Sequence, residues 1–200
     1  LRDICARPPS RTNATAELKQ RAAEARAWLF EHALPLWWSR GYDTLAQCFH
    51  ERVALDGLPQ PELARRVRVQ ARQTVVYARA GALGWNGPWR DAVAAGAEVL
   101  LSRGLRPDGG TRHMLGPDGA PSDERRDLYD LAFALFALAE AGRALQRPDL
   151  LARGEALADW LEQTWANPLG GFDEGEITPT PPRRQNPHMH VFEALLALHE

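Results

Sequence analysis

The ionisable side chains best suited to chemistry stand close together in Pro182–Ala194, which reads PRRQNPHMHVFEA. Asn186 is a typical helix N-cap and Pro187 a typical first helical residue, so a helix is predicted to begin here. His188 and His190 then fall in its first turn, near unpaired N–H groups and the positive end of the helix dipole. Because that environment disfavours a cationic imidazole, the pattern predicts a neutral histidine, the form that a general base needs.

The two histidines are expected to differ in role. On a helix, residues two apart point about 200 degrees away from each other, so they face different surroundings. We expect His190 to be catalytic, with a structural role at the helix start as the alternative. His188 is expected to contact the substrate or, by default, to anchor the neighbouring loop. A metal site is disfavoured because helical ligands share a face when they stand four residues apart, and we expect no metal and no other cofactor.

Arginines supply the fixed positive charge that proton abstraction beside a carbonyl requires, since the enediolate develops negative charge on oxygen. Arg72 can supply this charge if packing brings it close to His190. Its alternative role is a salt bridge, with Glu62, Asp130 or Glu193 as the partner. It belongs to a basic segment, expected to combine a solvated face with site residues, whose other members are Arg65, Arg66 and Arg68.

Predicted loops hold further candidates for substrate contacts. Arg183 and Arg184 lie in a proline-rich loop, where each could order the loop or meet a substrate oxygen, and Arg184 is taken as a binding residue. His113 falls in another long loop, expected on the same face as this one, and is also taken as a binding residue. Trp85 and Trp89 lie near a loop and are candidates for stacking on a sugar, although most tryptophans are expected in the core.

The composition limits the class of protein. The chain has 200 residues, 44% hydrophobic and 25% charged, which suits one globular domain with a sizeable core. A net charge of -2 and a pI near 6.3 argue against nucleic acid as a partner. No apolar run is long enough to span a membrane, and two cysteines, Cys5 and Cys48, suit a reducing cytoplasm without disulfides or zinc. We therefore expect a cytoplasmic protein that binds a small molecule, and neither nucleic acid nor a membrane.

Helical periodicity dominates the chain, with recurring Ala, Leu and Arg and few β-branched runs. Six helices are predicted, several of them with proline or serine at the start. Their approximate ranges are Ala16–Arg40, Pro61–Ala80, Trp89–Arg103, Ser122–Arg143, Pro148–Ala166 and Pro187 onward. The first of them is expected to bury Leu18, Ala22, Ala25, Leu29 and the aromatic run Trp37-Trp38.

An internal repeat follows from the alternation of long and short connections. A glycine and its neighbour recur after each odd-numbered helix, at Gly41-Tyr42, Gly110-Thr111 and Gly171-Phe172. Asp56-Gly57 and Asp118-Gly119 are typical tips of β-hairpins in the first two long loops. Each unit is therefore a helix, a long loop with a small hairpin, and a returning helix, which stack into a solenoid or a closed toroid. Long loops on one face would form the binding surface.

The last predicted helix reaches Glu200 without a glycine or a closing element. Part of a toroid would leave apolar helix faces uncovered at its edges. We therefore expect either further chain, or a second copy in a homodimer, to cover these edges.

Three segments together resemble the N-acylglucosamine 2-epimerase family. They are PRRQNPHMHVFEALLAL, RVQARQTVVYA and DLYDLAFALFALA, and the resemblance extends from about residue 16 to Glu200. It implies an all-α fold, an (α/α)6 barrel of twelve helices in two concentric rings. Residues 1–200, with about six helices and small β-hairpin loops, would be the N-terminal half of one catalytic domain, with the C-terminal half absent from this chain.

The resemblance also implies roles for individual residues. Arg72 is similar to the family arginine that stabilises the enediolate oxygen, and His190 to the histidine of the first half of the barrel. Asn186 resembles a ligand of a sugar hydroxyl, and Tyr129 a substrate contact. The family acts without metal or nucleotide, and its further histidines come from the second half of the barrel.

The expected activity is proton transfer at C2 of an unphosphorylated hexose through a cis-enediolate, as in a mannose to fructose isomerase. The first alternative is 2-epimerisation of an N-acyl hexosamine or a disaccharide. A glycoside hydrolase or lyase would need two carboxylates across a cleft, for which loop residues Asp173, Glu174 and Glu176 are available. A helical-repeat scaffold without catalysis would explain the repeat but not the cluster around His190.

Overall fold

The computed structural model describes residues 11–177 and 183–200. Within these residues the chain folds into α-helices joined by loops that carry five short strands. The helices are α1 (Arg11–Trp28), α2 (Leu34–Gly41), α3 (Val67–Ala82), α4 (Trp89–Val99), α5 (Leu128–Leu145), α6 (Pro148–Trp165) and α7 (Gln185–His199). The strands are β1 (Tyr42–Asp43), β2 (Cys48–Phe49), β3 (Arg65–Arg66), β4 (Met114–Leu115) and β5 (Pro121–Asp123).

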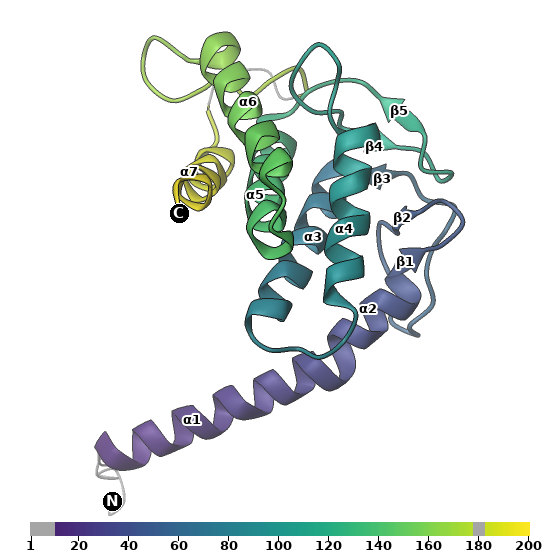
Figure 1. Ribbon diagram of the computed structural model, residues 1–200, viewed down its shortest axis with the longest axis vertical. Coiled ribbons are helices and arrows are strands. Elements are labelled where there is room, and N and C mark those ends of the chain that lie inside the picture. Colours follow the sequence, from purple (N-terminus) through teal and green to yellow (C-terminus); the bar gives the residue numbers. More distant parts are fainter. Residues whose placement is uncertain (1–10, 178–182) are drawn as a thin grey trace, which may run out of the picture.

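The helices that follow the long loops form a layer of their own. In this layer α5 packs between α3 and α7, while α4 packs against α3 and α6 against α5 on the outer side (Figure 1). All three inner helices begin where a long loop ends, so their N-termini lie at the same end of the layer. This alternation of inner and outer helices is the arrangement expected of an α/α barrel.

Helix α5 forms the centre of the core because it is apolar on all sides. Its residues from Leu131 to Gly142 are all buried, which requires neighbours on every face. Glu140 is the charged residue within this run, and it is paired with Arg79 and Arg143. Such an element cannot move independently of its neighbours, so its N-terminal residues are held firmly.

The long loops are joined to each other by backbone pairing. In the first loop β1 pairs with β2, and β3 pairs across to β4, which pairs in turn with β5 of the second loop. The second loop meets the third where Leu128 N donates to Glu174 O at 3.1 Å and Glu176 N donates to Arg126 O at 2.8 Å. The loops therefore form one connected surface over the start of the inner helices.

The predicted internal repeat is confirmed by matching turns at Gly110 and Gly171, but not at Gly41, which is the last residue of α2. Arg106 N donates to Gly110 O and Asn167 N donates to Gly171 O, at 3.1 and 2.8 Å, and each turn ends in two glycines with positive φ. The Asp118-Gly119 hairpin tip also forms, between β4 and β5. Asp56-Gly57 makes a tight reversal, closed by the bridge between Val53 and Pro59.

Two predicted helix starts are wrong, each by more than one turn too early. The second helix begins at Val67 instead of Pro61, because Arg65–Arg66 pairs with β4. The fourth begins at Leu128 instead of Ser122, which lies in β5, and the Asp127 side chain caps it by accepting from Tyr129 N at 2.8 Å. The ranges predicted around α4 and α6 are confirmed, the first with a π-helical last turn over Leu100–Gly104.

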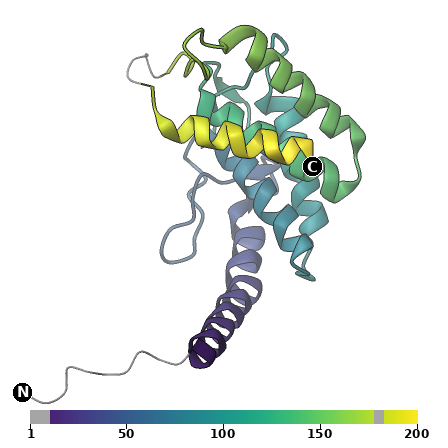
Figure 2. The ribbon, with the colours of Figure 1, turned by 90° about the vertical axis from the view of Figure 1, so that its left-hand side faces the viewer.

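The first predicted helix exists, and Leu29, Trp37 and Trp38 pack against the core as expected, but the rest of its expected burial is absent. Helices α1 and α2 are joined through a π-helical turn, Leu29–Ala33. Pro35, the second residue of α2, has no N–H group, and this disrupts regular α-helical hydrogen bonding at the junction. Leu18 is 71% exposed, and Ala22 and Ala25 are also exposed, while Leu29 packs against the core. Helix α1 extends away from the body, so no neighbouring helix covers it (Figures 1 and 2).

The uncovered apolar edge that was expected is present on α7. This helix lies across one side of the body (Figure 2). Its exposed apolar side chains are Met189, Phe192, Leu195 and Leu196, with Phe192 65% exposed. Among the described residues, no helix combines the length and the hydropathy needed to cross a membrane.

Candidate active site

A hollow of about 260 Å³ lies where α3, α5 and α7 begin. Its lining residues are Arg66, Arg68, Arg72, Tyr129, Arg184, Asn186 and Pro187. Four of these, from three distant segments, were predicted as site residues: Arg72, Tyr129, Asn186 and Arg184. The fold therefore brings the arginine of α3, the tyrosine of α5 and the polar start of α7 to one place.

His190 adjoins this hollow through shared aromatic neighbours. Its ring meets Tyr129 edge to face, with centroids 5.3 Å apart, and lies 4.5 Å from the ring centroid of Phe133. It opens on a second hollow of about 470 Å³, whose lining includes Phe136, Phe192 and Glu193. Tyr129 thus touches His190 and also lines the hollow that holds Arg72.

Glu193, one turn further along α7, orients the imidazole of His190. Its Oε2 lies 2.9 Å from His190 Nδ1. Since a carboxylate only accepts, the network assigns the proton of a neutral ring to Nδ1 and leaves the lone pair on Nε2. Within the described chain Nε2 has no hydrogen-bond partner, so it is available as a base.

Arg72 carries no carboxylate partner among the described residues. Its guanidinium lies over the ring of Phe133, 5.2 Å from the centroid. Of the three partners considered from the sequence, Asp130 binds Arg68 and Glu193 faces His190. The third, Glu62, is exposed and forms no ion pair with Arg72 in the described part of the chain. Arg72 and His190 therefore both contact Phe133, one with an uncompensated charge and the other with a free ring nitrogen.

Asp130 is a buried carboxylate that sequence reasoning considered only as a partner of Arg72. Its Oδ1 accepts from Arg68 at 3.1 Å, and its Oδ2 lies 2.6 Å from His113 Nδ1. Burial raises the pKa of Asp130, and the hydrogen bond from His113 and the charge of Arg68 only partly offset this. His113 is turned toward Asp130 and does not line the hollow, so the geometry makes it a support for Asp130 and Arg68 instead of the predicted substrate contact.

The start of α7 differs from its prediction. Asn186 is not the N-cap, because the helix begins at Gln185 and Arg184 is the capping residue. Glu174, buried in the third loop, accepts from both the backbone N and the Nε of Arg184. His190 consequently lies in the second turn, where the effect of the helix dipole on its imidazole is weaker than at the helix start.

His188 and Arg183 serve the loop. The Nδ1 and Nε2 of His188 lie 3.0 Å from Arg184 O and from Phe172 O, respectively. Arg183 donates to Gly170 O. This geometry is that of the loop-anchoring alternative for His188, which does not line the hollow. In the described part of the chain no group of three potential metal ligands includes either histidine of the pair.

Several other candidates have structural partners. Trp85 is buried and donates from its ring nitrogen to Phe30 O at 3.1 Å, and Trp89 packs against the core. Of the loop carboxylates, Asp173 accepts from Asn167 and Glu176 pairs with Arg126. The basic segment also divides, since Arg65 is fully buried and paired with Asp43 instead of being solvated.

Replacing Glu174 by glutamine is expected to lower the free energy of unfolding at neutral pH by about 2 kcal/mol. Breaking a buried ion pair costs roughly 3–5 kcal/mol, and the partial exposure of Arg184 screens this one. Burial alone would raise the pKa of Glu174, but hydrogen bonds from Arg184 hold it below its ordinary value of 4.5. The stabilisation is therefore present above pH 4.5 and is lost as the pH falls below it.

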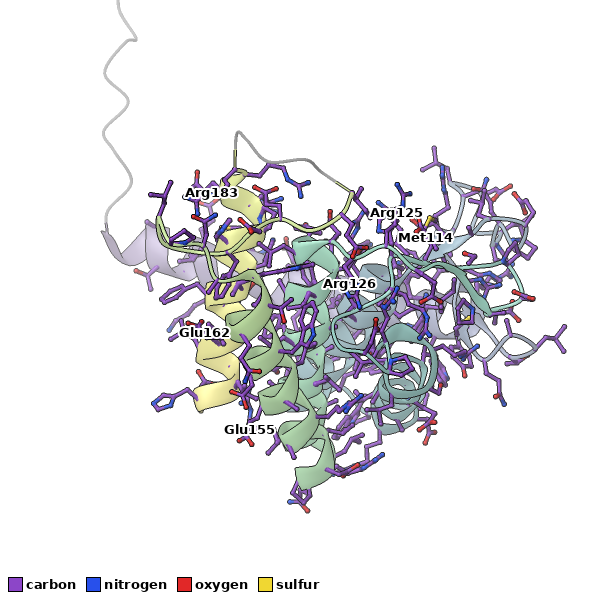
Figure 3. All side chains as sticks on the ribbon, turned by 90° about the horizontal axis from the view of Figure 1, so that it is seen from above. Met114, Arg125, Arg126, Glu155, Glu162 and Arg183 are labelled. Carbon is purple, nitrogen blue, oxygen red and sulfur yellow. The ribbon has the colours of Figure 1, made fainter. Side chains whose placement is uncertain are left out.

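Urea unfolding followed by circular dichroism measures this effect. The difference between wild type and Glu174→Gln should shrink as the pH is lowered through the acidic range. Glu162→Gln, at an exposed position on the outer helix α6, is the matched control (Figure 3). A difference that stays constant with pH, or that equals the control, would contradict the assigned pair.

Comparison with known proteins gives consistent matches. The family model described as N-acylglucosamine 2-epimerase (GlcNAc 2-epimerase) matches residues 48–200. A curated relative, the mannose-6-phosphate isomerase of Rhizobium meliloti, is 37% identical over 186 residues, covering 92% of this chain and 48% of the relative.

Solved structures agree with this match. The cellobiose 2-epimerase of Spirochaeta thermophila is 26% identical with a TM-score of 0.85, covering 95% of this chain and 50% of that one. A D-mannose isomerase is 22% identical with a TM-score of 0.77, covering 88% of this chain and 45% of that one. The chain thus spans about half the length of the proteins it matches, and its helices have the arrangement of an (α/α)6 barrel.

Proposed function

Because the chain belongs to the N-acylglucosamine 2-epimerase family, we propose that the protein is a sugar isomerase that moves a proton at C2 of a hexose. The observation that carries this proposal is that the oriented imidazole of His190 and the guanidinium of Arg72 both contact the ring of Phe133. Tyr129 contacts His190 and lines the hollow that holds Arg72. Relatives named as a mannose-6-phosphate isomerase and a D-mannose isomerase support an aldose to ketose conversion of the mannose to fructose type.

In the proposed mechanism the open-chain aldose places C2 at Nε2 of His190. The imidazole takes the C2 proton, and the electrons of that bond form a C1–C2 double bond while the charge moves to O1. The guanidinium of Arg72 stabilises this oxygen. O1 then takes up the proton that O2 releases, the imidazolium of His190 gives its proton to C1, and C2 becomes the carbonyl carbon of the ketose. Tyr129 and Asn186 would orient the sugar hydroxyls, and Glu193 holds the imidazole and supports its positive charge while it carries the proton.

Epimerisation at C2 is the second candidate, favoured by the similarity to a cellobiose 2-epimerase. Both reactions share the first step, and they differ in whether hydrogen returns to C1 or to the opposite face of C2. Glycoside hydrolysis has less support, because Asp173, Glu174 and Glu176 all have internal partners.

Hydrogen exchange in deuterated water tests the proposal. The purified protein is incubated with mannose, mannose 6-phosphate, glucose or N-acetylglucosamine, and the label is followed by NMR. Deuterium at C1 of a newly formed ketose is the expected result. Deuterium at C2 of an epimer would support the second candidate instead. Absence of exchange with every sugar, together with cleavage of a glycan, would contradict both.

A further inference from the structure

The hollow that holds Arg72 is more basic than C2 chemistry on a neutral hexose requires. Four of its seven lining residues are arginines, and none of the seven is acidic. A guanidinium only donates hydrogen bonds, so of these side chains only those of Tyr129 and Asn186 accept them. A neutral hexose presents several hydroxyl donors and would find few acceptors here. The lining is suited instead to a ligand rich in acceptor oxygens.

Three of the arginines are each paired with a buried carboxylate. Glu51 pairs with Arg66, Asp130 with Arg68, and Glu174 with Arg184. These carboxylates are 8%, 0% and 1% exposed, whereas the arginine side chains are 43%, 18% and 41% exposed. Arg184 also pairs with Asp127 at 3.4 Å. The guanidinium groups are thus more exposed than the carboxylates that hold them, and the arginines line the hollow while these carboxylates do not. Arginines oriented in this way lose little side-chain entropy on binding.

The backbone adds to the same electrostatic preference. Arg66 and Arg184 are the N-cap residues of α3 and α7, and Tyr129 is the second residue of α5. Three helices thus begin around the hollow, and a helix N-terminus carries partial positive charge. The effect is additional to that of the guanidinium groups, which are the principal donors.

We propose that this hollow binds the anionic substituent of a sugar substrate, and that the substituent is a phosphomonoester. Arg66, Arg68 and Arg184 hold the phosphate, while Arg72 remains free for the oxygen that becomes charged during proton transfer. A phosphate offers oxygens in several directions, which three guanidinium groups around one cavity match better than a single carboxylate would. This replaces the unphosphorylated hexose expected from the sequence. The identity of the substrate as an isomerised sugar rests on the proposed function, but the anion site does not.

Titration calorimetry tests the site independently of turnover. The probes are mannose 6-phosphate, mannose, glucuronate and inorganic phosphate. The variant is Arg66→Gln, in which Glu51 can still accept the hydrogen bond from the backbone N–H of residue 66, at 2.9 Å in the wild type. Arg153→Gln, at an exposed site on α6, is the matched control. Mannose 6-phosphate should bind at least about tenfold more tightly than mannose. Arg66→Gln should remove about tenfold of that affinity, whereas Arg153→Gln should retain it in full.

The salt dependence of the wild type supplies a readout that needs no variant. Affinity for mannose 6-phosphate should fall as ionic strength rises, while affinity for mannose should not. If glucuronate binds as tightly as mannose 6-phosphate, the assignment of the anion as a phosphomonoester is wrong, although the anion site remains. Equal affinity for mannose and mannose 6-phosphate, or full affinity in Arg66→Gln, would overturn the site itself.

The two proposals fail in different ways. Tight, salt-sensitive binding of mannose 6-phosphate without hydrogen exchange in any sugar would contradict the isomerase and retain the anion site. Rapid exchange in free mannose, with no gain for the phosphorylated sugar, would retain the isomerase and contradict the anion site.

Discussion

Replacing His190 by alanine is expected to lower the turnover of the sugar substrate by a factor of about 100 or more. The variant removes Nε2, the ring nitrogen that Glu193 leaves free by binding Nδ1 at 2.9 Å. No other histidine contacts both Tyr129 and Phe133 among the described residues. Steady-state kinetics with the sugar identified by the exchange experiment measures the effect.

A matched variant separates chemistry from helix stability. His199→Ala removes an exposed imidazole from the last turn of the same helix and should retain normal turnover. Thermal unfolding of both variants checks that His190→Ala is folded, because its ring also packs on two aromatic neighbours. Near-normal turnover of folded His190→Ala would rule out the assignment as base.

Replacing Arg72 by methionine is expected to lower kcat by a factor of about 100 to 1,000, the range seen when one donor to a developing oxyanion is removed. Methionine keeps an unbranched side chain against Phe133 while it removes the charge. Because Arg72 has no carboxylate partner among the described residues, the change leaves no buried anion unpaired. The loss should therefore appear in kcat with little effect on the free energy of unfolding.

Arg90 provides the control for Arg72. It lies over the ring of Trp89 on α4, 4.4 Å from the centroid, and so makes the same type of contact away from the site. Arg90→Met should leave kcat unchanged. Two results would contradict the role of Arg72 at the enediolate oxygen. One is that Arg72→Met unfolds enough of the protein to account for the lost activity, and the other is that it lowers kcat no more than Arg90→Met does.

The helices were predictable where a local signal decides them. Pro148 marks the start of α6, and the range ending near Ala166 follows from its periodicity. The starts of α3 and α5 were not predictable, since Arg65–Arg66 and Pro121–Asp123 become strands by pairing with β4. Those partners lie in another loop or across a bulge, and propensity within a window carries no information about them.

The residues that line the hollow were easier to predict from the sequence than the contacts they make. Arg72, Tyr129, Asn186 and Arg184 were identified from separate segments, and the fold brings them to one hollow. Arg68 was assigned only to a basic segment, although it stands four residues before Arg72 and so shares its helix face. The orientation of His113 toward Asp130 depends on a contact between the second long loop, directly before β4, and helix α5, and no local pattern reveals this contact.

A crystal structure with a bound open-chain analogue, such as a hexitol 6-phosphate, would show whether one ligand reaches both His190 and Arg72. We expect C2 of the ligand within reach of Nε2 of His190, and O1 at the guanidinium of Arg72. A ligand that contacts only one of these two groups, or that binds with Phe133 separating them, would contradict the shared site on which the proposed reaction depends.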